Sequence, residues 1–453
     1  MASEQSIDSL QIRALATGFV RARITMLDGR RVVEVDARGN TRAGSLSPED
    51  GHTIACGAAL ALEQRLPIIL RFASSGADIS EGVAALAGWG NAARNLTKCS
   101  GVVPIVAILS GATVSGPALM LGLADVVIMT AEAYAFVSGP VMVSQFTGVP
   151  IDNAELGGVS VHLSSSGVAS FFAADTEDAD QIAAEVLAFL PDHADKEPPS
   201  IPCSDPVNRP TPEAYDILPE SANGSYDVRE VIEVIVDDGE FLEPHAEWAA
   251  NLVTGFARIG GRAVGLVANQ PQTVAGTLDI EASRKGAAFV ALCDSFNLPL
   301  VTIVDTSGFY PGKDLEWRGM IRYGAQMAFA YARATVPRVN LTTRKSYGGA
   351  YIVMDSKEMG NDMALAWPSA QIAVMGAKGA VEILHRRESA ERRLELESAY
   401  EERLLNPYIA AERGTIDAVI DPADTRREIH SALEMLSSKR EKIPPRRHDN
   451  TPL

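Results

Sequence analysis

An internal duplication constrains the fold of this chain more than any other feature of its sequence. The apolar run PIILRF begins at Pro67 and leads into Ser75-Gly76. The run PLVTIV begins at Pro299 and leads into Ser307-Gly308, so both landmarks recur 232 residues further on (299 − 67 and 308 − 76). Three more pairs of landmarks keep the same order at offsets of 233 to 237 residues: Pro104 and Pro337, Gly116 and Gly349, Gly139 and Gly376. We therefore expect two domains of the same fold.

Each half alternates short apolar strands, Gly-containing turns and helices, which is typical of a buried, mostly parallel sheet. The predicted fold class is α/β, with two tandem domains related by duplication. Pro, Ser and acidic residues gather between the halves, as in a surface connection. The predicted organisation is an N-terminal domain over 1–200, a Pro-rich linker over 201–225, a C-terminal domain over 226–437 and a polar tail over 438–453.

Charge and cysteine content exclude several classes of partner. The chain has 58 acidic and 40 basic residues and a formal net charge of −18, which opposes binding of a phosphate backbone, so no nucleic-acid partner is expected. The cysteines form no C-x-x-C pair and no zinc-ligand spacing, so we expect no metal site and reduced thiols in a cytoplasmic protein. They are Cys56, Cys99, Cys203 and Cys293.

One segment raises the question of a membrane span. The stretch from Cys99 to Ala124 is uncharged and long enough to cross a bilayer. Pro104, Gly111 and Gly116 interrupt it, which favours a strand, a turn and a short helix within a buried sheet. The N-terminus MASEQSIDSLQIRALATGFV lacks the basic and apolar regions of a secretory signal. No membrane association is expected.

The chain lacks the familiar catalytic motifs G-x-S-x-G, H-E-x-x-H and the P-loop. Two Gly-rich turns stand at corresponding places instead, GATVSG over 111–116 and YGGA over 347–350, each between an apolar strand and a helix. Small residues let a ligand approach the backbone, and free N–H groups at a helix start stabilise a developing negative oxygen. Small residues also permit tight packing of a helix on a sheet, and both interpretations stay open from the residues alone.

Longer motifs resemble one family, the carboxyltransferase (β) subunits of biotin-dependent acyl-CoA carboxylases of the propionyl-CoA and acetyl-CoA type. The resemblance covers most of the chain and is densest in the C-terminal half. There it includes GFARIGGRAVGLVANQP (255–271), LDIEASRKGAAFV (278–290), CDSFNLPLVTIVDTSGFYPG (293–312), RKSYGGAYIVM (344–354), AWPSAQIAVMGAKGAVEI (366–383) and NPYIAAERGTIDAVIDPADTRREI (406–429). In the N-terminal half it includes SSGADISEGVAALAGWG (74–90), FVSGP (136–140) and ELGGVSVHLSSSGVA (155–169).

The resemblance implies two tandem crotonase-like (ClpP/crotonase) domains, dimer-based homo-oligomers that are often hexamers, and an active site between subunits. By analogy with the family, the N–H groups of Ser115 and Gly116 hold the thioester oxygen of an acyl-CoA as an enolate forms. Those of Gly349 and Ala350 polarise the ureido oxygen of carboxybiotin, whose nitrogen removes the α-proton, so no side-chain base is needed. The resemblance assigns acyl-CoA or biotin contacts to further residues: Gly76, Ala77, Gly139, Pro140, Gly348, Tyr351 and Ile352.

The resemblance also implies partners and a substrate class. The chain has no biotinyl-lysine A-M-K-M motif and no ATP-grasp region, so biotin is expected on a separate carrier protein that belongs to a biotin carboxylase or carrier subunit. The position that sets acyl length in the family falls on Ile352, where propionyl-selective members have Asp. The aliphatic side chain favours a substrate outside the strict propionyl pattern, although an Ile after a Gly turn is also typical of core packing.

The chain departs from the family pattern on the acyl-CoA side. Asp78 stands where the family has Arg, which removes a cation near the CoA phosphates. Ser115 replaces the first Gly of the turn, and Pro117 removes the N–H that follows. In the second half D-V-P-G-F becomes DTSGF over 305–309. His162 matches a family His, and we interpret it as a hydrogen-bonded structural group.

These departures leave two alternatives open beside the carboxyltransferase. The first is a decarboxylase of a malonyl-type or other carboxylated substrate that uses the same turns. The second is a non-catalytic paralogue in a mixed carboxylase complex, which an intact C-terminal half beside a drifted N-terminal half would fit.

Overall fold

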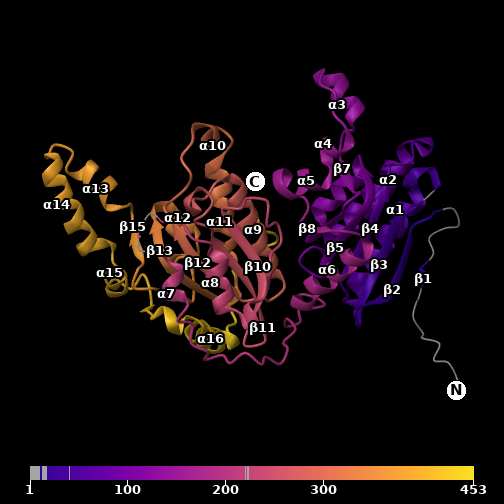
Figure 1. Ribbon diagram of the computed structural model, residues 1–453. Coiled ribbons are helices and arrows are strands. Elements are labelled where there is room, and N and C mark those ends of the chain that lie inside the picture. The colour runs from indigo at the N-terminus through magenta and orange to yellow at the C-terminus, as the bar shows by residue number, and fades with distance from the viewer. Residues whose placement is uncertain (1–10, 13–17, 40, 220, 222–223, 453) are drawn as a thin grey trace. The chain divides into compact units, whose positions relative to one another are not determined.

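The computed structural model describes residues 11–12, 18–39, 41–219, 221 and 224–452. The chain forms two compact units, of which unit 1 comprises Met1–Glu197 with Pro244–Trp248, and unit 2 comprises Pro198–Glu243 with Ala249–Leu453. Most of the N-terminal segment in which we expected no signal sequence, and part of the predicted linker, lie outside the described residues. Figure 1 shows the ribbon, and each unit is described by itself.

In its described residues, unit 1 contains an eight-stranded sheet in the order β1-β2-β3-β4-β5-β6-β8, with β7 paired to β5. The β1–β2 and β2–β3 pairs are antiparallel, and the pairs from β3 onward are parallel. The strands are β1 (Gln11–Ile12), β2 (Arg21–Leu27), β3 (Arg30–Arg38), β4 (Ile68–Ser74), β5 (Ile105–Val114), β6 (Val126–Thr130), β7 (Tyr134–Phe136) and β8 (Phe171–Ala173).

The helices of unit 1 have recognisable start signals. Helix α1 begins with a capping box, in which the Asp50 N–H donates to Ser47 Oγ at 3.2 Å and the Ser47 N–H donates to Asp50 Oδ2 at 3.0 Å. The α-helices are α1 (Pro48–Gln64), α2 (Val83–Cys99), α3 (Pro140–Thr147), α4 (Asn153–Gly157), α5 (Val159–Val161) and α6 (Thr176–Phe189). Shorter helical segments are η1 (Thr41–Gly44), η2 (Ile79–Glu81), η3 (Gly116–Leu123) and η4 (His162–Ser166).

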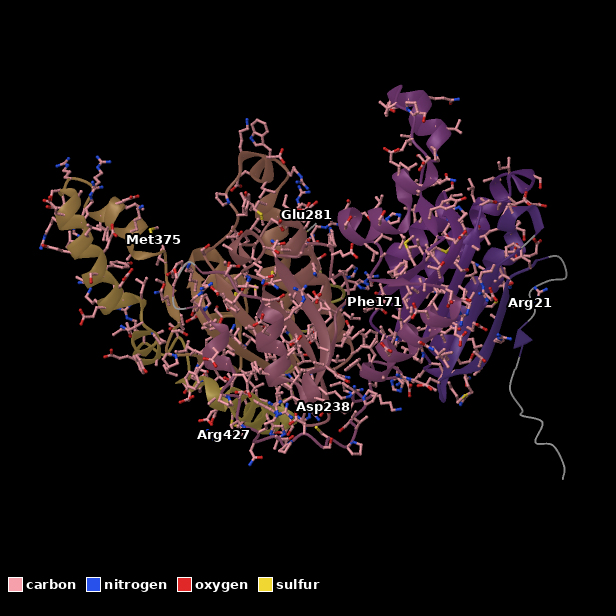
Figure 2. The ribbon with its side chains drawn as sticks, in the orientation of Figure 1. Arg21, Phe171, Asp238, Glu281, Met375 and Arg427 are labelled. Atoms are coloured by element: carbon pink, nitrogen blue, oxygen red, sulfur yellow. The ribbon has the colours of Figure 1, made fainter. Side chains whose placement is uncertain are left out.

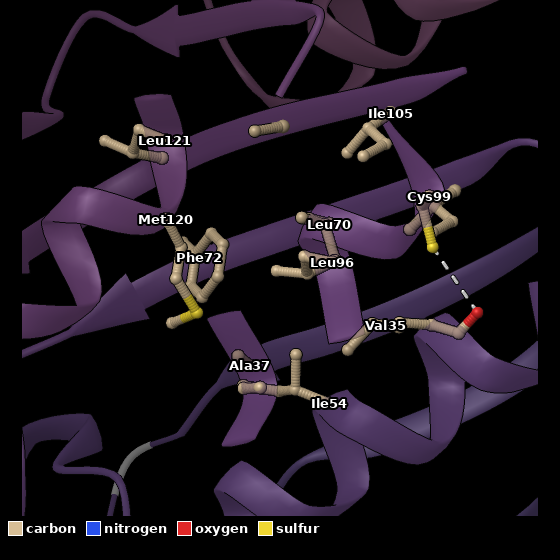
Figure 3. Packing of buried hydrophobic residues seen from close by; sticks show 14 of the residues in the cluster. Val35, Ala37, Ile54, Leu70, Phe72, Leu96, Cys99, Ile105, Met120 and Leu121 are labelled. Atoms are coloured by element: carbon tan, nitrogen blue, oxygen red, sulfur yellow. Dashed lines mark hydrogen bonds between the residues drawn. The ribbon is translucent and has the colours of Figure 1, made fainter. Parts of the chain in front are cut away.

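The core of unit 1 lies between the sheet and helices α1 and α2. Figure 3 shows Phe72 of β4 beside Met120 of η3, both fully buried. The dashed line marks the Cys99 thiol donating to the Ala58 carbonyl at 3.5 Å, which joins the end of α2 to α1. A Cβ on Gly51 of α1 would lie 2.2 Å from the carbonyl carbon of Gly88, so the two helices meet backbone to backbone.

In its described residues, unit 2 repeats this topology with an eight-stranded sheet in the order β16-β14-β13-β12-β11-β10-β9, with β15 paired to β13. Its strands are β9 (Phe241–Leu242), β10 (Leu252–Ile259), β11 (Arg262–Asn269), β12 (Leu300–Thr306), β13 (Arg338–Tyr347), β14 (Met363–Ala366), β15 (Gln371–Ala373) and β16 (Ala418–Val419). The β10–β11 and β9–β10 pairs are antiparallel, and the pairs from β11 onward are parallel, as in unit 1.

The helices of unit 2 include a long pair, α9 and α11, that pack on each other. The α-helices are α7 (Ala214–Ile217), α8 (Val228–Ile235), α9 (Ile280–Ser295), α10 (Lys313–Trp317), α11 (Met320–Arg333), α12 (Gly348–Val353), α13 (Ala377–Leu384), α14 (Ala390–Tyr400), α15 (Pro407–Glu412) and α16 (Thr425–Met435). Shorter helical segments are η5 (Asp237–Gly239), η6 (Val274–Gly276), η7 (Lys357–Met359), η8 (Glu401–Leu405), η9 (Pro422–Asp424) and η10 (Leu436–Ser438).

The duplication extends to single hydrogen bonds. An isolated bridge joins Leu46 to Ala77 in unit 1, and another joins Leu278 to Phe309 in unit 2, at the same offset of 232 residues (278 − 46 and 309 − 77). The β4–β5 register shifts just before Ser74, and the β12–β13 register shifts just before Thr306. Together with the shared strand order, these details confirm the predicted pair of domains of one fold.

The units differ from the predicted boundaries in two places. The segment expected as a linker packs on unit 2, where Thr211 is fully buried and its N–H donates to the Ala423 carbonyl at 2.8 Å. Pro244–Trp248, inside the predicted second domain, belongs to unit 1, because the His245 N–H donates to the Ser170 carbonyl at 2.9 Å. In the tail, the Gln326 side-chain amide donates to the Pro452 carbonyl at 2.6 Å.

Each unit carries an arm that stands away from its sheet, α3 in unit 1 and α13 with α14 in unit 2 (Figure 1). Met375, labelled in Figure 2, lies at the base of the second arm. The arms expose large apolar side chains, with Phe146 92% exposed on α3 and Leu394 66% exposed on α14. Such exposed apolar surface is typical of a protein interface.

The uncharged stretch from Cys99 to Ala124 contains strand β5 and the 3-10 helix η3, as the sequence predicted. Within the described ranges, every helix is too short or too polar to cross a bilayer.

Candidate active site

The first turn of interest in unit 1 follows strand β4. The Gly76 N–H donates to Ser74 Oγ at 3.2 Å, and Gly76 has a φ of +112°. The Leu46 N–H donates to the Gly76 carbonyl at 2.8 Å, and the Asp78 N–H donates to the Leu46 carbonyl at 2.9 Å. These bonds pass over the residue between, so the Ala77 N–H has no partner in the described part of the chain.

The second turn of unit 1 follows strand β5 and lies against the first. A Cβ on Gly76 would lie 3.3 Å from Ser115 Cβ. The Ser115 N–H donates to the Phe136 carbonyl at 2.8 Å, so it is used within the sheet. Gly116 begins η3, and its N–H has no partner among the described residues. The predicted donor pair therefore needs correction at Ser115, and the free N–H groups that the fold brings together are those of Ala77 and Gly116.

The indole of Trp89 covers Gly116. A Cβ at this position would lie 2.7 Å from Trp89 Cε2 and 2.8 Å from Trp89 Nε1, which explains why the turn needs glycine here. The Trp89 Nε1 atom is buried and has no hydrogen-bond partner in the described structure. Buried donors without a partner are rare in folded proteins, so this N–H marks the turn as unusual.

The other predicted acyl-side residues lie nearby on the arm. Gly139 caps α3 and Pro140 is its first residue. A Cβ on Gly139 would lie 3.5 Å from the ring of Phe136, the residue whose carbonyl holds Ser115. Gly139 therefore lies beside the support of the turn, whereas Pro140 starts the arm.

Two polar side chains beside this site have structural roles. His162 uses both ring nitrogens, Nε2 with the Ala135 carbonyl at 2.8 Å and Nδ1 with Ser166 Oγ at 2.7 Å, which confirms its interpretation as a structural group. Asp78, the residue in place of a family Arg, caps η2 by accepting the Ser80 N–H at 3.0 Å. Its carboxylate therefore has a local reason that is independent of any ligand.

Unit 2 reproduces the first turn after strand β12. The Gly308 N–H donates to Thr306 Oγ1 at 3.3 Å. The Leu278 N–H donates to the Gly308 carbonyl at 3.1 Å, and the Tyr310 N–H donates to the Leu278 carbonyl at 2.8 Å. The Phe309 N–H is thus free, like that of Ala77, among the residues that the structure describes. Sequence reasoning missed Phe309, although the 232-residue offset from Ala77 would have found it.

The second turn of unit 2 follows strand β13. Gly348 has a φ of +60°, close to the +64° of Ser115, and Gly349 is exposed. A Cβ on Gly349 would lie 3.2 Å from the Phe309 ring, so the two turns of this unit are also adjacent. Ala350 is fully buried, which leaves its N–H out of reach of a ligand and corrects the predicted pair at this residue. The accessible N–H groups are those of Phe309 and Gly349.

Two further predicted residues follow on α12. The Tyr351 hydroxyl donates to Glu358 Oε2 at 2.7 Å, and burial together with this carboxylate raises the pKa of Tyr351. Ile352 is 38% exposed, so it is available for contact with a ligand or a second chain. The structure therefore places Ile352 at the surface beside the turn and Tyr351 in a local hydrogen bond.

A buried ion pair supports the turns of unit 2 from behind. Arg344 Nε lies 2.9 Å from Asp305 Oδ2, and the Lys345 N–H donates to Asp305 Oδ1 at 3.1 Å. Burial raises the pKa of Asp305, and the neighbouring Arg344 opposes that rise. Because this pair ties the end of β12 to β13, it fixes the spacing between the Phe309 and Gly349 turns.

Comparison with known proteins agrees with this geometry. The carboxyl transferase domain family matches residues 6–451. The chain is 44% identical over 446 residues to the propionyl-CoA carboxylase beta chain of Saccharopolyspora erythraea, covering 94% of this chain and 82% of that protein. It is 39% identical over 428 residues to the methylmalonyl-CoA decarboxylase subunit alpha of Veillonella parvula, covering 94% of this chain and 84% of that protein.

A solved structure shows the same fold. The transcarboxylase 12S hexamer with methylmalonyl-coenzyme A and methylmalonic acid bound has a TM-score of 0.96 and 40% identity, covering 99% of this chain and 90% of that one. This likeness confirms the predicted tandem crotonase-like fold. The chain belongs to the carboxyl transferase domain family.

Proposed function

We propose that the protein is the carboxyltransferase subunit of an acyl-CoA carboxylase, moving a carboxyl group between carboxybiotin and the α-carbon of an acyl-CoA. The observation that carries this proposal is the pair of matching turns, each with accessible N–H groups and no neighbouring general base. Membership of the family and the names of its members support the same reaction. The activity belongs in a cytoplasm, where the four free cysteines stay reduced.

In unit 1 we assign the thioester oxygen of the acyl-CoA to the N–H groups of Ala77 and Gly116. When the α-proton leaves, the electron pair of the C–H bond moves onto this oxygen, and two fixed donors stabilise the negative charge. The α-carbon then forms a carbon–carbon bond to the carboxyl group. Because the donors belong to the backbone, they need no reorganisation when charge develops.

In unit 2 we assign the ureido oxygen of carboxybiotin to the N–H groups of Phe309 and Gly349. The turn fits such a group, because Gly349 is exposed and a side chain there would meet the Phe309 ring at 3.2 Å. When bound, carboxybiotin supplies the carboxyl group and a ureido nitrogen that accepts the α-proton. The chain's role is to orient the ureido group and withdraw electron density through its oxygen.

Partners follow from the same proposal. Biotin arrives on a separate carrier protein, and acyl-CoA on unit 1 of one copy meets carboxybiotin on unit 2 of another. The exposed apolar arms, including Phe146 and Leu394, support a dimer-based homo-oligomer. A hexamer is in line with the assembly of the similar transcarboxylase.

The proposal is tested by the reverse half-reaction, transfer of a carboxyl group from carboxylated CoA esters to free biotin. A panel of malonyl-, methylmalonyl- and ethylmalonyl-CoA is incubated with the full-length protein, and CoA-ester loss is followed by chromatography. Biotin-dependent turnover of one ester is expected. A folded, oligomeric protein that is silent across the panel would contradict the proposal and favour the non-catalytic paralogue.

A decarboxylase is the second candidate, and the similar decarboxylase subunit of Veillonella parvula favours it. The same turns would serve, since decarboxylation passes through the same enolate. Net direction separates the two: supplied with biotinylated carrier, biotin carboxylase, ATP, bicarbonate and acyl-CoA, a carboxyltransferase accumulates the carboxylated ester. A decarboxylase leaves the acyl-CoA unchanged in that mixture.

A further inference from the structure

Ser115 holds a backbone conformation that glycine normally occupies. Its φ is +64° and its ψ is −142°, a region in which side chains are strained. Its counterpart in unit 2 is Gly348, with a φ of +60°. The duplicated fold thus accepts glycine at this place, and the serine in unit 1 is a departure that costs stability.

The side chain of Ser115 does nothing for the fold that would explain this cost. It is exposed, and its hydroxyl makes no hydrogen bond within the described residues. A strained residue without a structural partner points to function.

The position of Ser115 shows what that function can be. Its Cβ lies against Gly76, next to the free N–H of Ala77, and the free N–H of Gly116 follows it directly. The buried Trp89 Nε1 at the same turn also lacks an acceptor. Donors from four residues gather here, and the described chain supplies no acceptor for any of them. Such a set matches an oxygen that becomes negative.

We infer that the Ser115 hydroxyl is a third donor to the thioester oxygen of a short acyl-CoA, beside the N–H groups of Ala77 and Gly116. This inference rests on the proposed function. The hydroxyl keeps its proton throughout, so it stabilises charge and takes part in no covalent step. Because its hydrogen bond strengthens as the enolate forms, its effect belongs in kcat rather than in KM.

Two variants separate the hydroxyl from the strain. Ser115→Gly removes both, so we expect a higher Tm and a kcat for transfer that is lower by about tenfold. Ser115→Ala removes the hydroxyl and keeps the strain, so the same loss of kcat is expected at an unchanged Tm. The matched control is Asp28→Gly, which relieves a φ of +45° in the β2–β3 turn of the same unit. It should raise Tm and leave the kinetics unchanged.

The full-length oligomer is used throughout, and binding of each CoA ester is measured by thermal shift beside turnover. A Ser115→Gly protein that is more stable and keeps the wild-type kcat would overturn the inference while the proposed function stands. An effect confined to KM would also overturn it, since the donor would then act on the ground state. A wild-type protein that neither turns over nor binds any ester would refute the proposed function and the role of Ser115 with it.

Discussion

Replacing Gly116 by alanine adds one methyl group to the acyl-side turn, and the structure shows what it meets. The new Cβ would lie 2.7 Å from Trp89 Cε2, closer than non-bonded carbon atoms approach. The backbone does not oppose the change, because Gly116 has no positive φ. The methyl group must therefore push the indole away or displace the N–H of residue 116.

The two consequences have different magnitudes. Overpacking of this kind costs about 1–3 kcal/mol of folding free energy, a modest part of the ~5–15 kcal/mol typical of a native protein. A catalytic donor displaced by about 1 Å costs about 100-fold in rate. Gly116→Ala should therefore lower Tm by a few degrees and lower kcat in the biotin transfer assay by about 100-fold.

Gly122 provides a matched control in the same 3-10 helix, because a Cβ there meets no atom within 4 Å. Gly122→Ala should keep stability within about 0.5 kcal/mol and activity unchanged. Adding Trp89→Leu to Gly116→Ala makes room for the methyl group and should restore part of kcat. A Gly116→Ala enzyme with more than half of the wild-type kcat would refute the reasoning.

Three further predictions concern other parts of the molecule. Gly349→Val pushes against the Phe309 ring at 3.2 Å and should abolish transfer while circular dichroism and oligomer size stay unchanged; full activity would exclude this turn from the site. Ile352→Asp should shift selectivity among acetyl-, propionyl- and butyryl-CoA, and an unchanged ratio of kcat/KM values would show that the residue does not line the acyl pocket. Burial raises the pKa of Asp125 to about 7 despite the hydrogen bond from the Ile105 N–H, so its folded-state pKa exceeds the unfolded one. Stability is then lost as pH rises from about 4 to 7, and Asp125→Asn should raise Tm more at pH 8 than at pH 5; an equal gain at both values would contradict the shift.

The duplication and the positions of the Gly turns could be read from the sequence, because Pro and Gly mark strand starts and turns in both halves. The donors themselves could not be read so directly. The Ser115 N–H is used by Phe136, and that pairing depends on strand β7, twenty residues along the chain. Ala350 looks equivalent to its neighbour Gly349 in sequence, yet packing buries it completely.

The unit boundaries illustrate the same difference between local and long-range information. Composition marked the Pro-rich segment as a connection, but composition does not show that Thr211 reaches Pro422 and Ala423 far along the chain. The assignment of Pro244–Trp248 to unit 1 depends on Trp248, whose ring lies over Gly167. Such contacts join residues that no local pattern links.

The copied turns have an evolutionary consequence. Biotin is the same molecule in every carboxylase of this kind, so selection holds the turn of unit 2 constant, and glycine persists at residue 348. Acyl chains differ between metabolic tasks, so the corresponding residue of unit 1 is free to vary, and here it has become Ser115. Gene duplication thus separated a conserved half of the catalyst from an adaptable half, and new acyl specificities can arise without loss of the ancestral chemistry.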